Sequence, residues 1–309
     1  MGRRDAMTQA HSRLPGITYE IGRRTERRLH LFRPDALMNQ VFLYCLGYAI
    51  QKSGTRLMAV ALMSNHYHAI VHDPEGRICE LTEVLNGLLT KATQAMRGWQ
   101  GRVFDGAGPS YLELLTVDAI IDRTAYTLAN PTAAGLVRYS KDWPGVRTRV
   151  SDIGVRTMTI ARPPAFFAED GTMPESVELR PELAGDVLER GGLEQAHARI
   201  ADAVEKREAK ARAEVEAAGW SFKGADRVLK SSPFARATTF EQRHGMNPRF
   251  ASAGDEAALR AAIKREEEFV AQYGVARERW LAGERDVLWP AGTYAMRRWH
   301  RVRCAEPPG

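Results

Sequence analysis

Two histidines separated by one residue, His66 and His68, stand in an apolar stretch of the chain. On a β-strand alternate side chains point to the same face, so the two imidazoles would project side by side while Tyr67 points the other way. Neutral imidazole nitrogens are good ligands for divalent transition metals. The pair therefore predicts half of a metal site, on a strand expected over residues 65–71.

A tyrosine and an asparagine, Tyr126 and Asn130, lie one helical turn apart about 60 residues later. A phenol can attack a phosphate as a nucleophile, and a carboxamide oxygen can complete a metal site. Combined with the histidine pair, this set suits cleavage of DNA through a covalent phosphotyrosine link. Pro131 follows directly, and because a residue before proline avoids the α region, we expect a distorted last turn.

Each of these residues also has an ordinary structural explanation. The histidines could be hydrogen-bonded residues at a strand end, and Tyr126 could be a half-buried residue of an amphipathic helix. His72 shares the strand parity of the pair but stands next to Asp73, where the strand is expected to end. We therefore expect His72 to take no part in the site.

Hydrophobic periodicity predicts the elements that position these residues. Strands are expected at 17–25, 56–62, 65–71 and 111–116, and helices at 36–52, 78–99 and 119–130. Asp35 and Asp118 are the expected N-caps of the first and third helices. The order predicts an α+β fold of the split βαβ type, with an antiparallel sheet and helices packed on one side.

The character of the chain changes after Trp143-Pro144-Gly145. Prolines and glycines mark an irregular segment, and helices are expected at 193–218 and from 255 to about 283. We expect two parts: residues 1–150, which hold the chemistry, and residues 151–309, a mainly helical extension. The extension has no assigned role, although contacts with DNA or a partner are open to it.

The positive charge is confined to the first part. Residues 1–150 carry 19 Lys and Arg against 13 Asp and Glu, whereas residues 151–309 carry 25 of each, so the whole net charge of +6 lies beside the candidate site. A basic field favours a polyanionic partner. Arginine side chains match phosphates and stack on bases, although they could equally form a solvated edge. The candidate DNA-binding arginines are Arg23, Arg24, Arg27, Arg28 and Arg33, with residues 297–301 as a weaker alternative.

The remaining composition is that of a cytoplasmic protein. No stretch reaches the 18 or so consecutive apolar residues of a membrane span, and the N-terminus lacks the apolar core of a secretory signal. The three cysteines, Cys45, Cys79 and Cys304, are far apart and have no zinc-binding spacing. We expect buried or idle thiols in a reducing compartment.

Several short segments, in order, resemble those of the single-tyrosine HUH transposases, and most closely the REP-associated tyrosine transposases. The resemblance covers roughly residues 15–150. The matching segments are Arg27-Arg28, Leu31-Phe32-Arg33-Pro34, Met63 to Val71, Asp73-Pro74-Glu75-Gly76, Tyr126 to Pro131, Ala133 to Val137 and Asp142-Trp143-Pro144-Gly145.

This resemblance implies a ferredoxin-like HUH nuclease domain in which His66 and His68 bind Mg²⁺ or Mn²⁺. Tyr126 would be the nucleophile, and Asn130 would be the third ligand, where other branches have glutamine. The implied substrate is single-stranded DNA at the foot of an imperfect, REP-like hairpin. It would be cut and rejoined without ATP, through a 5′-phosphotyrosine, by a monomer or homodimer at the bacterial nucleoid.

Three functions follow from these residues. The first is a metal-dependent endonuclease and strand transferase that acts on hairpin-bearing single strands. The second is a domesticated protein that binds such hairpins and no longer cuts them. The third is a small metal hydrolase that uses water, which gives Tyr126 no role and leaves the one-sided charge unexplained.

Overall fold

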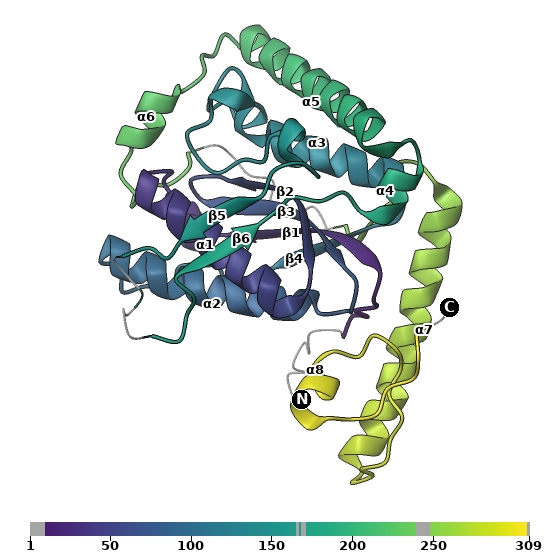
Figure 1. Ribbon diagram of the computed structural model, residues 1–309. Helices are drawn as coiled ribbons and strands as arrows, with labels where there is room; N and C mark the ends of the chain where they lie inside the picture. Colours follow the sequence, from purple (N-terminus) through teal and green to yellow (C-terminus); the bar gives the residue numbers. More distant parts are fainter. Residues whose placement is uncertain (1–9, 165–166, 168–170, 239–247, 308–309) are drawn as a thin grey trace, which may run out of the picture.

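The computed structural model describes residues 10–164, 167, 171–238 and 248–307. Its centre is a five-stranded sheet with the order β2-β3-β1-β4-β7 (Figure 1). The strands are β1 (Ile17–Arg24), β2 (Arg56–Leu62), β3 (His66–Asp73), β4 (Ser110–Leu114) and β7 (Phe250–Ala251).

Pairing within the sheet is antiparallel among β1 to β4, as expected. Strand β7 comes from the second half of the chain and pairs parallel with β4. The prediction of a wholly antiparallel sheet is therefore wrong at this edge, where a later segment of the chain joins the sheet. Strand β3 also runs to Asp73, so it ends two residues later than expected and includes His72.

One face of the sheet is covered by α1 (Ala36–Ser53) and α2 (Ile78–Arg97). Asp35 caps α1 as predicted, because its carboxylate accepts a hydrogen bond from the Met38 amide at 3.0 Å. Gly54 ends the helix in the left-handed conformation, with a φ of 70° that favours glycine. Together these helices bury an apolar core against alternate residues of β1, β2 and β3.

The opposite face is covered by α3 (Val117–Ala133), on which the long helix α5 (Gly192–Ala217) packs (Figure 1). The prediction that all helices lie on one side is therefore wrong. The strands also carry apolar residues toward this face, among them Met58, Ile70 and Leu112, and α3 buries them.

Helix α3 differs from its expected form at both ends. Its N-cap is Thr116, whose hydroxyl accepts from the Ala119 amide, whereas the predicted cap Asp118 pairs with Arg199 of α5. The helix continues through Pro131 to Ala133, so Asn130 lies inside it rather than at its end.

The rest of the second half surrounds this core. Strands β5 (Met158–Ala161) and β6 (Ser176–Leu179) form a hairpin against α1. Helices α5 and α7 (Glu256–Leu281) match the two long helices predicted for this half. The remaining elements are α4 (Gly185–Glu189), α6 (Ala225–Lys230), α8 (Ala295–His300) and the 3₁₀ helices η1 (Glu26–Arg28), η2 (Ser140–Asp142) and η3 (Val150–Asp152).

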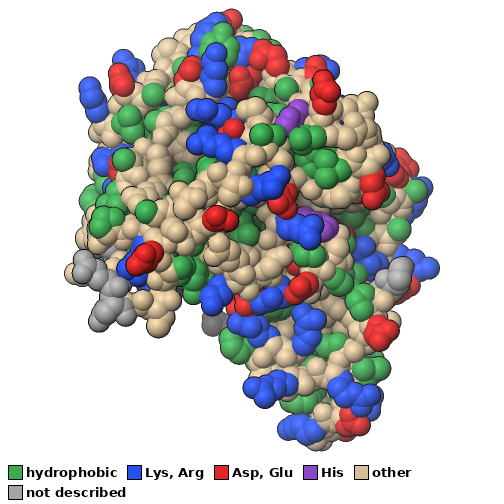
Figure 2. All heavy atoms as spheres, in the orientation of Figure 1, with side chains coloured by type: hydrophobic (Ala, Val, Ile, Leu, Met, Phe, Trp, Pro, Cys, Tyr) green, Lys and Arg blue, Asp and Glu red, His purple; other side chains and the backbone are tan. Residues whose placement is uncertain are grey.

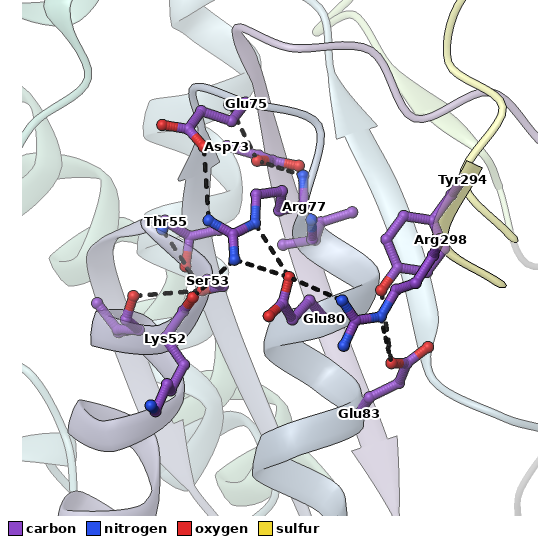
Figure 3. A network of polar contacts seen from close by, with 12 residues as sticks. Lys52, Ser53, Thr55, Asp73, Glu75, Arg77, Glu80, Glu83, Tyr294 and Arg298 are labelled. Carbon is purple, nitrogen blue, oxygen red and sulfur yellow. Dashed lines mark hydrogen bonds and ion pairs between the residues drawn. The ribbon is translucent and has the colours of Figure 1, made fainter. Parts of the chain in front are cut away.

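The C-terminal segment is tied to α2 by ion pairs. Figure 3 shows Arg298 of α8 beside Glu80 and Glu83, at 3.8 and 3.9 Å. Glu80 also accepts a hydrogen bond from Arg77 at 2.9 Å, which joins α8 to the turn after β3.

In Figure 2, Lys and Arg side chains gather on the lower lobe, where Figure 1 places α7 and α8. The division of the chain near residue 150 remains a prediction, since the two halves make contact at several places.

Within the described part of the chain, no helix is long and apolar enough to cross a membrane.

Candidate active site

Strand β3 presents His66 and His68 to the face that α3 covers. The two imidazole rings are 5.1 Å apart between centroids and nearly perpendicular. The Tyr126 ring of α3 lies 5.6 Å from the His68 ring, also perpendicular to it. All three residues, together with Asn130, line one cavity of about 600 Å³. The structure thus brings together the four residues that the sequence singled out, from two elements 60 residues apart.

His66 is held as a neutral imidazole. Its Nδ1 lies 2.7 Å from Oδ1 of Asn65, which leaves Nε2 as the nitrogen available to a ligand. Burial lowers its pKa well below the ordinary value, and the neighbouring His68 and Arg24 lower it further, while a hydrogen bond with Asn130 opposes the shift. The neutral imidazole is the form that binds metals.

His68 is oriented by a buried carboxylate. Its Nδ1 lies 2.9 Å from Oε1 of Glu20, a β1 residue that is only 4% exposed. Burial disfavours the Glu20 carboxylate, but its contacts with His68 and Arg123 outweigh this and lower its pKa. An ionised carboxylate behind an imidazole fixes the ring's tautomer and raises its basicity toward a metal.

Glycine at position 22 leaves room for this arrangement. Gly22 pairs with His68 across β1 and β3. A Cβ atom here would lie 3.4 Å from Nδ1 of His68 and 3.0 Å from Oγ of Ser110, which is tighter than most such contacts. A larger residue would therefore press on the imidazole that Glu20 orients.

Two guanidinium groups flank the Tyr126 ring. Arg123, one turn earlier on α3, lies 4.1 Å from the ring centroid and is paired with the second oxygen of Glu20. Arg207 of α5 lies 5.8 Å from the same centroid and is paired with Asp122. Cations over an aromatic face are attracted to the ring. The second half of the chain thus contributes a charged residue beside the candidate nucleophile.

The donors at this cavity fit a divalent cation only in part. Among the described residues, no group of three His, Cys, Asp or Glu side chains could hold a metal. A cation here would rely on the two imidazoles and the carboxamide oxygen of Asn130, which is 7% exposed, with its remaining positions filled by water or substrate oxygens. The neutral state of His66 and the Glu20 carboxylate behind His68 are what such a site needs.

The predicted DNA-binding arginines divide into two groups. Arg23 and Arg24 line the cavity. Arg27 is exposed and pairs with Glu26, and Arg33 pairs with Asp35 and donates to the Ser231 carbonyl. Arg27, Arg28 and Arg33 form the second group, which lies outside the cavity lining. A DNA role for these five arginines remains a prediction.

Three residues of the site were not singled out from the sequence. Glu20 and Arg123 had detectable signals: Glu20 is a charged residue in an apolar strand, and Arg123 precedes Tyr126 by one helical turn. Arg207 had no such signal, because its place depends on how α5 docks on α3.

His72 takes no part in the cavity, as expected: it lies outside the cavity lining and contacts Thr18 at 3.1 Å. The cysteines form no disulfide, and burial raises the pKa of Cys45 to about 12.

Two of the solved structures to which the chain is similar are described as transposases. The structure of a REP-associated tyrosine transposase bound to a REP hairpin aligns with 48% of this chain and 84% of its own, at 17% identity and a TM-score of 0.40. A candidate transposase from Deinococcus radiodurans R1 aligns with 34% of this chain and 85% of its own, at 15% identity and a TM-score of 0.27. No protein-family model matches the sequence, and no curated protein matches it either. Because the alignments cover less than half of the chain, we infer the chemistry from the geometry of the site itself.

Proposed function

We propose that this protein is a metal-dependent endonuclease and strand transferase for single-stranded DNA, with Tyr126 as its nucleophile. The observation that carries the proposal is the meeting of Tyr126, His66, His68 and Asn130 around one cavity. The succession β1-α1-β2-β3-α2-β4 and the strand order β2-β3-β1-β4 support a ferredoxin-like domain. The hairpin in the substrate is taken from the sequence resemblance.

The protein's own residues supply the nucleophile and its surroundings. The Tyr126 oxygen would form a bond to phosphorus while the bond to the 3′ oxygen breaks, leaving a 5′-phosphotyrosine and a free 3′-hydroxyl. The phenol gives up its proton, and the departing 3′ oxygen takes one. Arg123 holds the phenol ring, and Arg23 and Arg24 at the cavity lining would bind strand phosphates. The covalent link conserves the energy of the broken bond for rejoining.

His66, His68 and Asn130 would hold a divalent cation, Mg²⁺ or Mn²⁺. When bound, such an ion polarises a phosphate oxygen and stabilises the charge that develops there. Glu20 orients the His68 imidazole toward this task. A hydrolase that activates water would need none of the contacts that surround Tyr126. A hairpin-binding protein that no longer cuts would have no use for a complete set of ligands and nucleophile.

The test is covalent capture. A labelled hairpin oligonucleotide is incubated with the full-length protein and Mn²⁺ or Mg²⁺, and the products are separated on a denaturing gel. We expect an adduct that peptide mapping assigns to Tyr126, lost in Tyr126→Phe with DNA binding retained. Tyr139→Phe is the matched control, since this exposed tyrosine also lies under an arginine but outside the cavity. An adduct that persists in Tyr126→Phe would remove that residue from the mechanism.

A further inference from the structure

A second cavity, of about 280 Å³, lies where β7 joins the edge strand β4. It borders the candidate active site, because Ser110 and Pro248 line both cavities. Its polar lining comes from both halves of the chain. The side chains that matter here are His11, Arg13, Tyr19, Tyr111, Glu113 and Arg249.

Two donors of this lining have no partner. Tyr19 is 2% exposed, and its hydroxyl makes no hydrogen bond in the described part of the structure. Nε of Arg13 is likewise buried without a partner. The Arg13 guanidinium lies 4.4 Å from the Tyr111 ring centroid and donates to the Ser12 carbonyl. Because a buried donor without an acceptor costs free energy, these groups suit the binding of a group with acceptor atoms.

The charges around the cavity are compensated except at Arg13. Glu113 pairs with Arg265, and Glu266 pairs with Arg249 at 2.7 Å. His11 lies 3.2 Å from Glu266, and burial lowers its pKa, which favours the neutral ring. Arg13 has no ion pair with any described carboxylate. Burial opposes its charge, but its contacts with Cys79 and Tyr19 outweigh burial and raise its pKa, so it stays charged. The cavity therefore carries an uncompensated positive charge.

We propose that this cavity binds a phosphate group, through the Arg13 guanidinium and the Tyr19 hydroxyl. A phosphate offers both the negative charge and the acceptor oxygens that the two donors lack. Since Ser110 and Pro248 border both cavities, a DNA strand that leaves the candidate active site around this edge of the sheet would place one of its backbone phosphates here. This last step rests on the proposed function, whereas phosphate binding itself does not.

Removing one hydroxyl tests the site without disturbing the fold. In Tyr19→Phe an unpaired buried hydroxyl is lost, so the free protein should be as stable as wild type or more stable. Tyr67→Phe is the control, because Tyr67 is equally buried but donates to Oδ1 of Asn86 at 2.9 Å. Thermal unfolding of each full-length protein is followed in inorganic phosphate and in chloride of the same ionic strength.

We expect phosphate to raise the unfolding temperature of wild type and Tyr67→Phe above that in chloride, and to give no such gain in Tyr19→Phe. Equal gains in all three proteins, or no gain over chloride in wild type, would overturn the proposal. We also expect Tyr19→Phe to bind a hairpin oligonucleotide about tenfold more weakly, the size of one hydrogen bond to a charged group.

The failures of the two proposals are distinguishable. If wild type forms no adduct but shows the Tyr19-dependent phosphate effect, the phosphate site stands and the strand-transfer function falls. If the phosphate effect is present and oligonucleotide affinity is unchanged in Tyr19→Phe, the strand phosphate is not the ligand and that part of the inference is wrong.

Discussion

The two faces of the central sheet have different contents, although the same strands build both. On the face under α1 and α2, Tyr67 of β3 is fully buried and packs against Phe42 of α1, with ring centroids 5.7 Å apart. On the face under α3, the neighbours of Tyr67 along the strand are His66 and His68, which are mostly but not fully buried. One strand thus serves a core on one side and a candidate active site on the other.

The difference comes from how far each face is covered. Helices α1 and α2 together close their face, so almost every inward residue is apolar. Helix α3 covers the apolar middle of the other face, around Met58 and Ile70, and leaves a cavity at the end where β3 begins. Polar side chains can stay partly hydrated there, and buried ones such as Glu20 are satisfied by partners.

The largest effect is expected at the histidine pair itself. Replacing His66 with alanine removes a ligand, so we expect Mn²⁺ affinity, measured by calorimetry, to fall about a hundredfold or more. His72→Ala is the control from the same strand and the same parity, and should change Mn²⁺ affinity little. If His66→Ala and His72→Ala lost equal Mn²⁺ affinity, the metal would not bind specifically at the cavity beside His66.

Replacing Glu20, the carboxylate behind His68, should have a smaller effect on Mn²⁺ affinity. Glu20→Gln keeps the shape but loses the charge that orients His68 and Arg123, so Mn²⁺ affinity should fall about tenfold. Glu113→Gln is the control, a buried glutamate on β4 paired with Arg265 outside this cavity. An unchanged affinity in Glu20→Gln would mean that His68 needs no such support.

The same carboxylate predicts a pH dependence of stability. The folded protein holds the pKa of Glu20 below its ordinary value of 4.5, so the unfolded chain binds a proton first as the pH falls. The stabilisation by Glu20 is therefore complete above about pH 4.5 and is lost as the pH falls below it. In chemical unfolding, the stability difference between wild type and Glu20→Gln should shrink over that range.

The smallest effect, on the rate of adduct formation, is expected from changing Arg207 of α5, the helix that packs on α3. Arg207→Ala removes one guanidinium from beside Tyr126, and we expect adduct formation to slow about fivefold, as for one partly exposed cation–π contact. Arg199→Ala is the control, because Arg199 makes the equivalent ion pair from α5 to Asp118. A similar slowing in both variants would assign the effect to the docking of α5 and not to Tyr126.

Local patterns in the sequence were sufficient to predict most helices and strands of the first half and the grouping of its candidate site residues. Alternation in β3 placed His66 and His68 on one face, and helical spacing placed Tyr126 and Asn130 together. The N-cap of α1 followed from Asp35, and its bounds followed from the helical spacing of apolar residues. These features depend on neighbours within a few residues, which is the range that periodicity and capping report.

What the sequence did not reveal depends on contacts between distant segments. The position of α3 on the second face could not be read from its own periodicity, because an amphipathic helix can cover either side of a sheet. Strand β7 is two residues long and has no periodicity to detect. The role of Glu20 depends on two partners, His68 and Arg123, that lie 48 and 103 residues away.

The two strands at the edges of the antiparallel part of the sheet, β2 and β4, are both covered by other segments of the chain. The exposed side of β2 bonds to residues 146–148, through the Leu62 amide to the Val146 carbonyl and the Thr148 amide to the Val60 carbonyl. The exposed side of β4 bonds to the stretch around β7, where the Glu113 amide donates to the Arg249 carbonyl at 2.9 Å. Unpaired strand edges invite another copy of the same chain to add to the sheet and seed aggregates. Residues 146–148 and the segment around β7 therefore also protect these strands from pairing with another copy of the chain, a duty separate from any chemistry at Tyr126.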